Sequence, residues 1–526
     1  MTTVGEQLVD WLEAFGVDTV FGIPGVHTVE MYRGLSTSSM KHMTPRHEQG
    51  AGFMADGYWR ASGKVAACFV ITGPGLTNIL TPMAQAFADS VPMLVVSSVN
   101  RRSALGLGAG DLHEIANQGL IAAQAAAFSH TLSDPAQLGP VLARAWAVFE
   151  GARPRPVHIE IPVDMFSMPA VGTVGARTGI RPPAPEGAAV REAMAVLEAA
   201  KNPLILAGGG AKHADIASLA EHLSAPVVMT TNARGILAST HPLAIPASPS
   251  LPAIRALMRD ADAVLAIGTE FGRTDYNMYD LDDPEIPGTL IRVEIDPNQM
   301  LRGADPDIAL LGDSAAAAEA LLAAASDERE TDWTPARTPR EAAFGDLGEK
   351  YETIVRVLDL IRDTLPDAPI VSDSTQAAYA GNLYFAATGP RRWFGAASGY
   401  GALGYGLPGA IGAARAIGGP VVCLAGDGGL QFTLAELGLA VEENLPVVLI
   451  VWDNSGYGEI KDYMLKNGIT PVGVDLHTPD FIGIGKAYGA ATGRVRTLDE
   501  LPMLLTEAAR RRGPTLLHLP ESVVLG

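Results

Sequence analysis

Residues 420–456 read PVVCLAGDGGLQFTLAELGLAVEENLPVVLIVWDNSG, and this stretch indicates the fold. Two apolar runs, VVCLA and PVVLIVW, have the length and the valine and isoleucine content of buried β-strands. The first run ends in Gly426-Asp427-Gly428-Gly429 and the second ends in Asp453-Asn454-Ser455-Gly456. In a parallel sheet both strand ends lie at the same edge, where ligands of open α/β sheets bind. We therefore expect an α/β fold with a ligand site at this edge.

The two turns carry residue types that suit a metal ion and a diphosphate. Asp427 and Asn454 would present oxygen ligands, which Mg²⁺ prefers, with Ca²⁺ as the alternative. Gly426, Gly428 and Gly429 leave backbone N–H groups free to face phosphate oxygens at the start of the next helix. Either turn alone is also typical of an ordinary strand-to-helix connection. The two together, at this spacing, favour the binding site.

The rest of the chain repeats this alternation of short apolar runs and helical stretches, which is typical of parallel sheets covered by helices. Because 526 residues are too many for one hydrophobic core, several domains are expected. A proline-rich segment after Pro162 and a charged segment at 326–344 read as linkers. We predict three doubly wound parallel-sheet domains, at 1–170, 186–325 and 345–526.

Composition excludes several classes of protein. Lysine and arginine number 38 against 58 aspartate and glutamate, and the resulting net charge of −20 argues against a nucleic-acid partner. Two cysteines cannot build a disulfide framework, and the N-terminal residues TTVGEQLVDWLEAFGV lack the basic start and apolar core of a signal peptide. Apolar runs are too short to cross a bilayer. We expect a cytoplasmic protein with no membrane partner.

The Gly-Asp-Gly turn followed by an asparagine-bearing turn resembles the fingerprint of thiamin-diphosphate-dependent enzymes. Members of this family usually carry two asparagines where this chain has Asp453-Asn454, and the second is the metal ligand. The resemblance implies that Asp427, Asn454 and the Gly456 carbonyl bind Mg²⁺ and that Tyr457 lies beside the cofactor. The branch resembled is that of acetolactate synthase and benzoylformate decarboxylase, which implies a pyrimidine-binding, a central and a diphosphate-binding domain, in that order.

The N-terminal segment PRHEQGAGFMADGYWRASG, residues 45–63, carries the second resemblance. Glu48 lies at the start of a helix with apolar residues on one face. The matching glutamate of the family bonds the pyrimidine ring of the cofactor and takes part in the proton relay that activates it. Two other readings apply to Glu48: a zinc-protease HExxH motif, which fails because the second histidine is missing, and a carboxylate that favours the helix dipole.

Other turns match the family's cofactor site. GPGLTN begins at Gly73 and resembles the turn beside the pyrimidine. Thr375 and Gln376 resemble the turn that contacts the diphosphate. Gly401 and Leu403 lie in the loop under the cofactor, and Leu403 matches the apolar residue that holds the cofactor bent, which brings the reacting atoms together. Leu403 could equally be an ordinary core residue.

Two glycine-rich stretches raise the question of a nucleotide. Gly404–Gly409 formally satisfies GxGxxG, but it does not follow a strand, so a nicotinamide site is not favoured. In the central block, LAGGGAK at 206–212 follows a predicted strand, and some relatives bind FAD or ADP there. No acidic residue is placed for a ribose. We expect a structural central domain without FAD.

The substrate is less well marked than the cofactor. In the segment GDLHEIANQGLIAAQAAAFSH, residues 110–130, Leu112-His113-Glu114 replaces the FQE of acetolactate synthase. The histidine that benzoylformate decarboxylase carries before its turn is replaced by Ile71. His113 is the candidate for passing a proton to the reaction intermediate, because histidine titrates near neutral pH. The alternative is a histidine that only packs the pocket wall.

Several segments, among them GIPGVHTVEMYRGL and ADSVPMLVVSSVN, are most similar to bacterial 5-guanidino-2-oxopentanoate decarboxylases. The resemblance implies decarboxylation of a 2-oxo acid to an aldehyde and carbon dioxide. A guanidinium tail requires a carboxylate. The candidates are Asp111, Glu114, Glu459 and Asp462. The alternatives are a carboligase of the acetolactate synthase type and a cofactor-binding regulator without activity.

The resemblance also implies a homodimer or homotetramer. In the family, the first block of one subunit faces the third block of its partner, so Glu48 and Asp427 would complete one site only in a pair of chains. We further expect the apolar loop Gly399–Gly409 to be buried against the second chain, because a free monomer would expose it to water.

Overall fold

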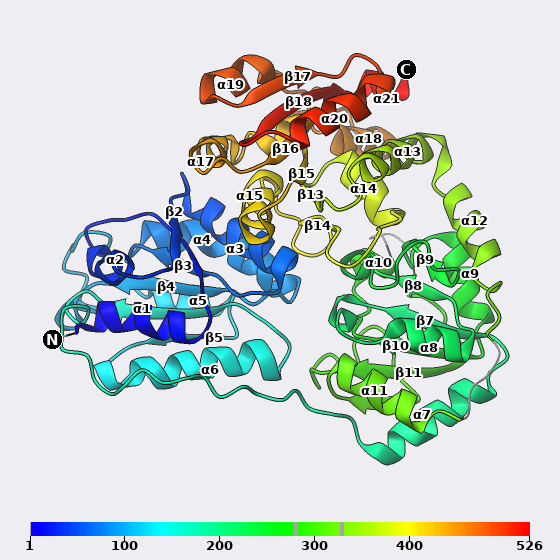
Figure 1. The fold of residues 1–526 in the computed structure, drawn as a ribbon, viewed down its shortest axis with the longest axis horizontal. Coiled ribbons are helices and arrows are strands. Elements are labelled where there is room, and N and C mark those ends of the chain that lie inside the picture. The colour runs from blue at the N-terminus through cyan, green and yellow to red at the C-terminus, as the bar shows by residue number, and fades with distance from the viewer. Residues whose placement is uncertain (1, 278–281, 327–330) are drawn as a thin grey trace.

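The computed structural model describes residues 2–277, 282–326 and 331–526 and contains three parallel six-stranded sheets, each flanked by helices. This confirms the predicted fold class. Figure 1 shows the N-terminal and central blocks side by side and the C-terminal block above both. The domain limits 1–170, 186–325 and 345–526 stay predictions. Residues 278–281 of the predicted central domain and 327–330 of the predicted linker lie outside the described residues.

The first sheet has the order β2-β1-β3-β4-β6-β5. Its strands are β1 (Thr19–Gly22), β2 (Lys41–Met43), β3 (Ala67–Val70), β4 (Leu94–Val99), β5 (Phe128–Thr131) and β6 (Val157–Pro162). Its helices are α1 (Val4–Ala14), α2 (Val29–Leu35), α3 (Glu48–Ser62), α4 (Pro74–Ala88), α5 (Gln118–Ala123) and α6 (Leu138–Gly151). The chain then runs to the central block through a connection that is largely exposed at 167–184, after Met165 and Phe166, which are buried.

The central sheet has the order β12-β11-β10-β7-β8-β9, which is the order of dinucleotide-binding folds. Its strands are β7 (Pro203–Ala207), β8 (Val227–Met229), β9 (Ala244–Ile245), β10 (Ala263–Ile267), β11 (Thr289–Glu294) and β12 (Ile308–Leu311). Its helices are α7 (Gly187–Ala199), α8 (Ile216–Leu223), α9 (Pro252–Asp260), α10 (Arg273–Tyr276) and α11 (Ser314–Ala324), and α12 (Arg337–Gly345) leads to the third block.

The third sheet, β14-β13-β15-β16-β18-β17, repeats the topology of the first. Its strands are β13 (Ile370–Ser372), β14 (Trp393–Gly395), β15 (Val421–Gly426), β16 (Val447–Asp453), β17 (Ala491–Arg494) and β18 (Thr515–Pro520). Its helices are α13 (Gly348–Thr364), α14 (Gln376–Leu383), α15 (Gly406–Ile417), α16 (Asp427–Leu430), α17 (Leu437–Glu442), α18 (Gly458–Lys466), α19 (Phe481–Tyr488), α20 (Leu501–Ala509) and α21 (Glu521–Leu525).

Strand order places a topological switch point at the same position in the first and third sheets. The order reverses between β1 and β3 in the first sheet and between β13 and β15 in the third. Connections that leave such a pair of strands run to opposite faces, so a crevice opens at their carboxyl ends, and ligands of open α/β sheets bind there. Functional residues are therefore expected in the turns that follow these four strands.

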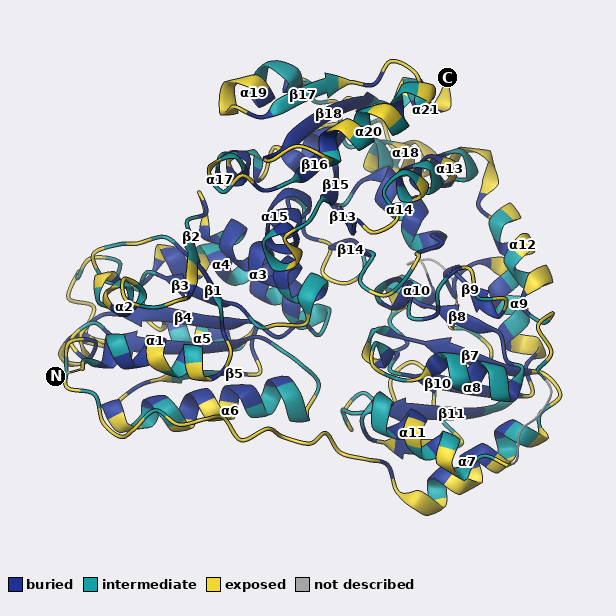
Figure 2. Cartoon of the chain, in the orientation of Figure 1, coloured by how far each residue is buried: buried dark blue, intermediate teal, exposed yellow. Residues whose placement is uncertain are grey.

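A close contact between α3 and α15 joins the first and third blocks of one chain. A Cβ on Gly57 would lie 2.0 Å from the Gly409 carbonyl oxygen, and a Cβ on Gly412 would lie 1.9 Å from the Met54 carbonyl oxygen. Only glycine lets the two backbones approach this closely. One apolar core extends across both blocks, and both helices are largely buried in Figure 2.

This contact corrects one expectation. The loop Gly399–Gly409 was predicted to be buried by a second chain, but Gly404–Gly409 is buried within this chain, where α15 packs on α3. Only the beginning of the loop, Gly399 to Gly401, is exposed. In the part of the chain that the structure describes, no helix is long and apolar enough to cross a membrane.

Candidate active site

Glu48 lies at the carboxyl edge of the first sheet, where β2 leads into α3. Its neighbour His47 caps the helix by accepting the N–H of Gln49, so Glu48 occupies the first turn. The side chain is 9% exposed, and one carboxylate oxygen accepts a hydrogen bond of 2.9 Å from the Asn78 amide. Asn78 belongs to the GPGLTN segment, yet its partnership with Glu48 was not predicted, because thirty residues separate the two.

The turn after β3 lies against His113. Gly73 has φ +67°, and a Cβ there would lie 2.4 Å from the His113 carbonyl oxygen, so the position requires glycine. Ile71 is half-buried between Gly25 and Gly75, since a Cβ on either glycine would meet its side chain within 2.8 Å. The same Cβ on Gly75 would lie 3.4 Å from Glu48. Glu48, Ile71, Gly73 and His113 therefore form one cluster.

Glu114 is engaged by its own loop. Its carboxylate accepts the backbone N–H of Gly110 at 2.7 Å and of Asp111 at 3.1 Å, and the Gly110 hydrogen bond is the main cause that lowers the pKa of Glu114. This carboxylate shapes the loop that carries His113. Because two backbone N–H groups already bind the Glu114 carboxylate, it is less available to a substrate guanidinium than was expected from the sequence.

Asp373 organises the switch point of the third sheet, and no sequence motif marks it. It follows β13, is fully buried, and accepts the N–H groups of Ser374, Gly404 and Gly406 at 2.8 to 3.1 Å. Burial raises its pKa. The half-buried Leu403 directly precedes Gly404, so Asp373 fixes the loop that holds Leu403.

Three oxygen atoms meet where the turns after β15 and β16 approach each other. The amide oxygen of Asn454 lies 2.8 Å from the Gly456 carbonyl oxygen and 3.2 Å from one Asp427 carboxylate oxygen. The other Asp427 oxygen is buried and has no hydrogen-bond partner among the described residues. Burial, and then the nearby Asp453, raise the pKa of Asp427 to about 6. One carboxylate, one amide and one carbonyl oxygen suit a hard divalent cation, so these residues fit a magnesium site.

Glycines keep the walls of this site close. A Cβ on Gly428 would lie 2.8 Å from the Tyr457 ring, one on Gly429 would lie 3.0 Å from Asp373, and one on Gly426 would lie 3.2 Å from the Thr375 hydroxyl. Thr375 and Gln376 are buried at the start of α14, and the Gln376 side-chain oxygen accepts a hydrogen bond of 3.2 Å from the Asn454 amide. A Cβ on Gly456 would lie 2.1 Å from the Val474 carbonyl oxygen. Gly401 is exposed, and a Cβ there would meet no atom within 4 Å.

Glu459 lies on α18, directly after the Asn454 turn. Its carboxylate accepts the Tyr351 hydroxyl at 3.3 Å, whereas Asp462, one turn later, pairs with Lys350 at 3.2 Å. α18 has no buried residue, although it carries Ile460. The helix therefore presents acidic and apolar side chains at the rim of the metal turn.

The predicted residues thus fall into two clusters within one chain. Glu48, Ile71, Gly73 and His113 gather at the first sheet, and Asp427, Asn454, Gly456 and Gln376 gather at the third. In residues 2–277, 282–326 and 331–526, no hydrogen bond or ion pair joins the first cluster to the second. Each cluster occupies a switch point.

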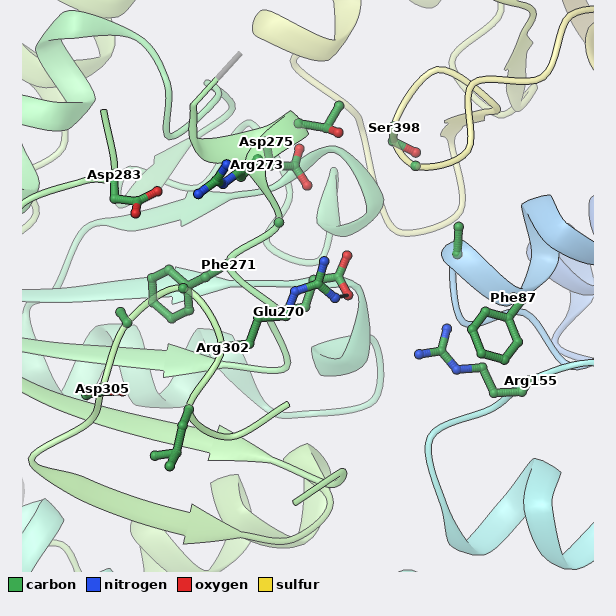
Figure 3. A pocket seen from close by; sticks show the side chains of 17 residues that line it. Phe87, Arg155, Glu270, Phe271, Arg273, Asp275, Asp283, Arg302, Asp305 and Ser398 are labelled. Atoms are coloured by element: carbon green, nitrogen blue, oxygen red, sulfur yellow. Dashed lines mark ion pairs between the residues drawn. The ribbon is translucent and has the colours of Figure 1, made fainter. Parts of the chain in front are cut away.

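A cavity lies between the central block and its neighbours. It encloses about 710 Å³ and is shown in Figure 3, with Phe87 and Arg155 on the side of the first block and Glu270, Arg273 and Arg302 on the central block. Burial, and then the nearby Arg153, lower the pKa of Arg155 to about 10. The cavity has the size of a ligand pocket and carries both signs of charge.

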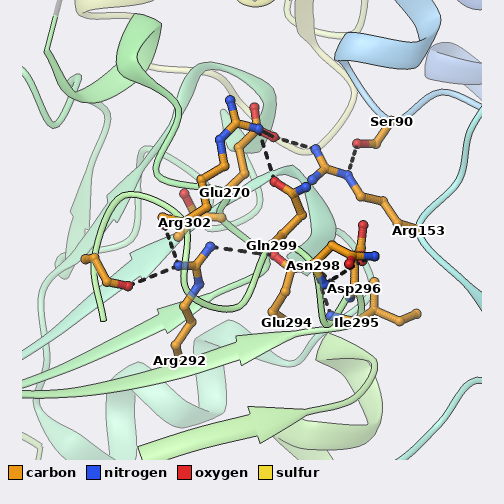
Figure 4. Close-up of polar contacts among 12 residues, drawn as sticks. Ser90, Arg153, Glu270, Arg292, Glu294, Ile295, Asp296, Asn298, Gln299 and Arg302 are labelled. Carbon is orange, nitrogen blue, oxygen red and sulfur yellow. Dashed lines mark hydrogen bonds and ion pairs between the residues drawn. The ribbon is translucent and has the colours of Figure 1, made fainter. Parts of the chain in front are cut away.

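Glu270 and Arg302, which line this cavity, take part in ion pairs. Figure 4 shows Glu270 between Arg153, at 2.5 Å, and Arg302, at 3.6 Å. Glu294 ends β11, and its carboxylate accepts the N–H groups of Ile295 and Asp296. β8, where dinucleotide folds place their ribose-binding acid, is followed by Thr230 and Thr231. The absence of FAD stays a prediction.

Comparison with protein families matches three models in order along the chain. They are the N-terminal TPP binding domain (residues 2–121), the central domain (190–321) and the C-terminal TPP binding domain (373–519) of thiamine pyrophosphate enzymes. The chain belongs to the thiamine pyrophosphate enzyme family. Thiamine pyrophosphate is thiamin diphosphate, so the predicted family and cofactor are confirmed.

Curated relatives in this family cover almost the whole chain. The probable 2-ketoarginine decarboxylase AruI of Pseudomonas aeruginosa is 45% identical over 530 residues, which span 98% of this chain and 94% of that protein. An acetolactate synthase of Arthrospira platensis is 30% identical over 562 residues, which span 97% of this chain and 93% of that protein. The acetolactate synthase isozyme 3 large subunit of Escherichia coli is 30% identical over 537 residues, which span 97% of this chain and 92% of that protein.

Proposed function

We propose that this enzyme decarboxylates 5-guanidino-2-oxopentanoate, also called 2-ketoarginine, to an aldehyde and carbon dioxide, with thiamin diphosphate and Mg²⁺. The observation that carries the proposal is the 45% identity to a probable 2-ketoarginine decarboxylase over nearly the full length of both chains. The site geometry supports the same chemistry, as the following residues indicate.

The oxygen set of the third block supports the metal assignment. Asp427, Asn454 and Gly456 would hold Mg²⁺, and the backbone N–H groups of Gly428 and Gly429 would face the diphosphate. When bound, thiamin diphosphate supplies the electron sink that accepts the electron pair left by departing carbon dioxide.

Two residues of the first block are proposed to move protons. Glu48, held by Asn78, would exchange a proton with the pyrimidine ring of the cofactor, and its burial excludes competing water. His113 would donate the proton that completes the aldehyde, because imidazole can both hold and release a proton near neutral pH. Ile71, half-buried beside both, would line the pocket.

Glu459 is the carboxylate that we propose for the guanidinium tail. Glu114 is used by backbone N–H groups and Asp462 by Lys350, whereas Glu459 has only the Tyr351 hydroxyl among the described partners. A carboxylate with free acceptor positions can bind a guanidinium through two parallel hydrogen bonds. The substrate would then lie with its tail toward α18.

We propose that the enzyme is a homodimer or a dimer of dimers, with each site built from two chains. Among the described residues of one chain, no hydrogen bond or ion pair joins the two clusters, although each is complete in its own block. Exposed apolar side chains accompany both clusters: Val26, Leu107 and Leu112 in the first block, and Phe432, Ile460 and Val472 in the third. A second copy would remove these surfaces from water.

We also propose a cytoplasmic location. Cys68 and Cys423 are both buried and unpaired, which suits a reducing compartment.

Product analysis tests the proposed reaction. Purified enzyme with thiamin diphosphate and Mg²⁺ is given a panel of 2-oxo acids, and carbon dioxide, aldehyde and ligation products are measured. The proposal expects 5-guanidino-2-oxopentanoate to be preferred and an aldehyde to be released. The second candidate, an acetolactate synthase-like carboligase, is favoured by the 30% identity to acetolactate synthases. It would join the decarboxylated acid to a second carbonyl compound, and a new carbon–carbon bond as the main product would replace our proposal.

A further inference from the structure

His27 lies at the switch point of the first sheet, across from the turn that follows β3. It belongs to the connection between β1 and α2, whereas His113 belongs to the loop that follows β4. Eighty-six positions separate the two histidines, yet their ring centroids are 5.4 Å apart, with the rings at 68° in an edge-to-face arrangement. Both rings therefore lie at the carboxyl edge that carries Glu48.

The ring of His27 is held by a buried pair of hydroxyl groups. Its Nδ1 lies 3.3 Å from the Thr72 hydroxyl, and that hydroxyl lies 2.9 Å from the Ser98 hydroxyl. Thr72 and Ser98 are both buried, so the anchor is shielded from solvent. His27 itself is half-buried and is fixed on one side only, which leaves its other face toward His113.

His113 is placed by its backbone rather than by hydrogen bonds to its ring. Its φ of +63° lies in the left-handed region, and its carbonyl oxygen rests on Gly73. Its Nδ1 is buried and has no hydrogen-bond partner among the described residues. A buried unpaired nitrogen costs free energy unless a ligand or a proton acceptor reaches it, which points to a role with substrate rather than in the core.

We infer that His27 is a positioning residue for His113, whose ring it holds by edge-to-face contact at the switch point. This inference rests on the proposed decarboxylation. In the protonating step, the N–H bond of His113 breaks and a C–H bond forms on the carbon that has lost carbon dioxide. His113 then regains its proton from solvent, which completes the proton balance of the step.

Electrostatics agrees with this geometry. Burial, and then the nearby His113, lower the pKa of His27, while Asp111 on the same loop as His113 acts in the opposite direction. Two imidazolium ions at this separation repel each other, so the second proton binds less readily than the first.

The test measures deuterium exchange at the imidazole C2–H of each histidine by peptide mass spectrometry of the full-length protein, without cofactor or substrate. We expect His113→Asn to raise the pKa of His27, because the substitution removes the neighbouring imidazole that helps to lower it. Asparagine tolerates positive φ, so this variant keeps the loop. His130→Asn, on β5 of the same sheet, is the matched control and should leave the pKa of His27 unchanged.

A second measurement separates positioning from structure. His27→Gln should lower kcat about tenfold or more, change KM little, and move the pH profile of kcat, whereas a purely structural role would leave the profile in place. Thr72→Val, which removes the anchor, should have the same effect on a smaller scale. If His113→Asn leaves the pKa of His27 unchanged, or if His27→Gln leaves the profile unchanged, the inference is overturned. The exchange result stands apart from the product analysis, so failure of the proposed reaction is recognised separately.

Discussion

Complementation between two inactive chains tests how the active site is divided. One chain carries Glu48→Gln and the other carries Asp427→Ala, so each loses one of the two clusters. In the structure, no hydrogen bond or ion pair joins Glu48 to Asp427 or Asn454 among the described residues, although both blocks pack together through α3 and α15. Each site would therefore take Glu48 from one chain and Asp427 from the other.

The expected recovery follows from counting sites. Each variant alone should retain at most about 1% of wild-type turnover, because Glu48→Gln removes an acid–base group, a loss of roughly 100-fold or more, and Asp427→Ala removes a metal ligand. In a mixed dimer, one site carries both substitutions and the other carries neither. Random pairing of equal amounts makes half of the dimers mixed, so about a quarter of all sites, and about a quarter of wild-type activity, should return.

The assay co-expresses the two chains with different affinity tags and purifies mixed dimers over both, which should raise recovery to about half. Asp427→Ala mixed with Asn454→Ala is the control, because both lesions then lie in the same cluster and no intact site forms. Mixed dimers that stay inactive, or an active monomer in sedimentation, would refute a site shared between chains.

Further outcomes are expected from single substitutions. Asp427→Ala should weaken Mg²⁺-dependent thiamin diphosphate binding at least about 100-fold in calorimetry without unfolding the chain, since a charged oxygen ligand is lost; tight binding in a chelator would contradict this. Glu459→Leu should lower kcat/KM for 5-guanidino-2-oxopentanoate about 100-fold but spare 2-oxopentanoate, and an equal loss for both acids would remove Glu459 from the tail site. Burial lowers the pKa of His158 to about 3, so the unfolded chain binds the extra proton and stability should fall as pH drops from about 6.5 towards 3. His158→Gln should flatten this dependence of the melting temperature, and an unchanged slope would assign it to other groups. Gly57→Val should destabilise the protein by about 1–3 kcal/mol through overpacking, whereas Gly345→Ala, with nothing within 4 Å, should be neutral; equal melting temperatures would deny the α3–α15 contact.

Sequence alone predicted those features that depend on residues close together in the chain. The strands before Asp427 and Asn454 are continuous apolar runs that end in turn residues, so both the parallel sheet and the meeting of the two side chains followed from strand geometry. Glu48 was placed at the start of a helix, and α3 begins there. Its role, like that of the other site residues, stays a prediction.

Features that depend on distant partners were missed. Asp373 accepts N–H groups from Gly404 and Gly406, about thirty positions away, and nothing near Asp373 in the sequence marks this. The pairing of His27 with His113 depends on the strand order, which the sequence pattern did not provide.

The wrong expectation for the loop Gly399–Gly409 has the same origin. A small residue on one helix indicates close packing only when the facing residue is also known, and Gly57 faces Gly409 from 352 positions away. An apolar loop was correctly expected to be covered, but the covering element belongs to the same chain.

The sharing of apolar cores between blocks has a consequence for unfolding. One core contains residues of the first and third blocks, and another contains residues of the central and third blocks. The third block therefore cannot melt without opening both cores to water, although each sheet has its own strand pairing. We expect a single cooperative calorimetric transition rather than three. A fragment that ends before residue 345 should be aggregation-prone, because α3 and the central sheet would each lose an apolar neighbour.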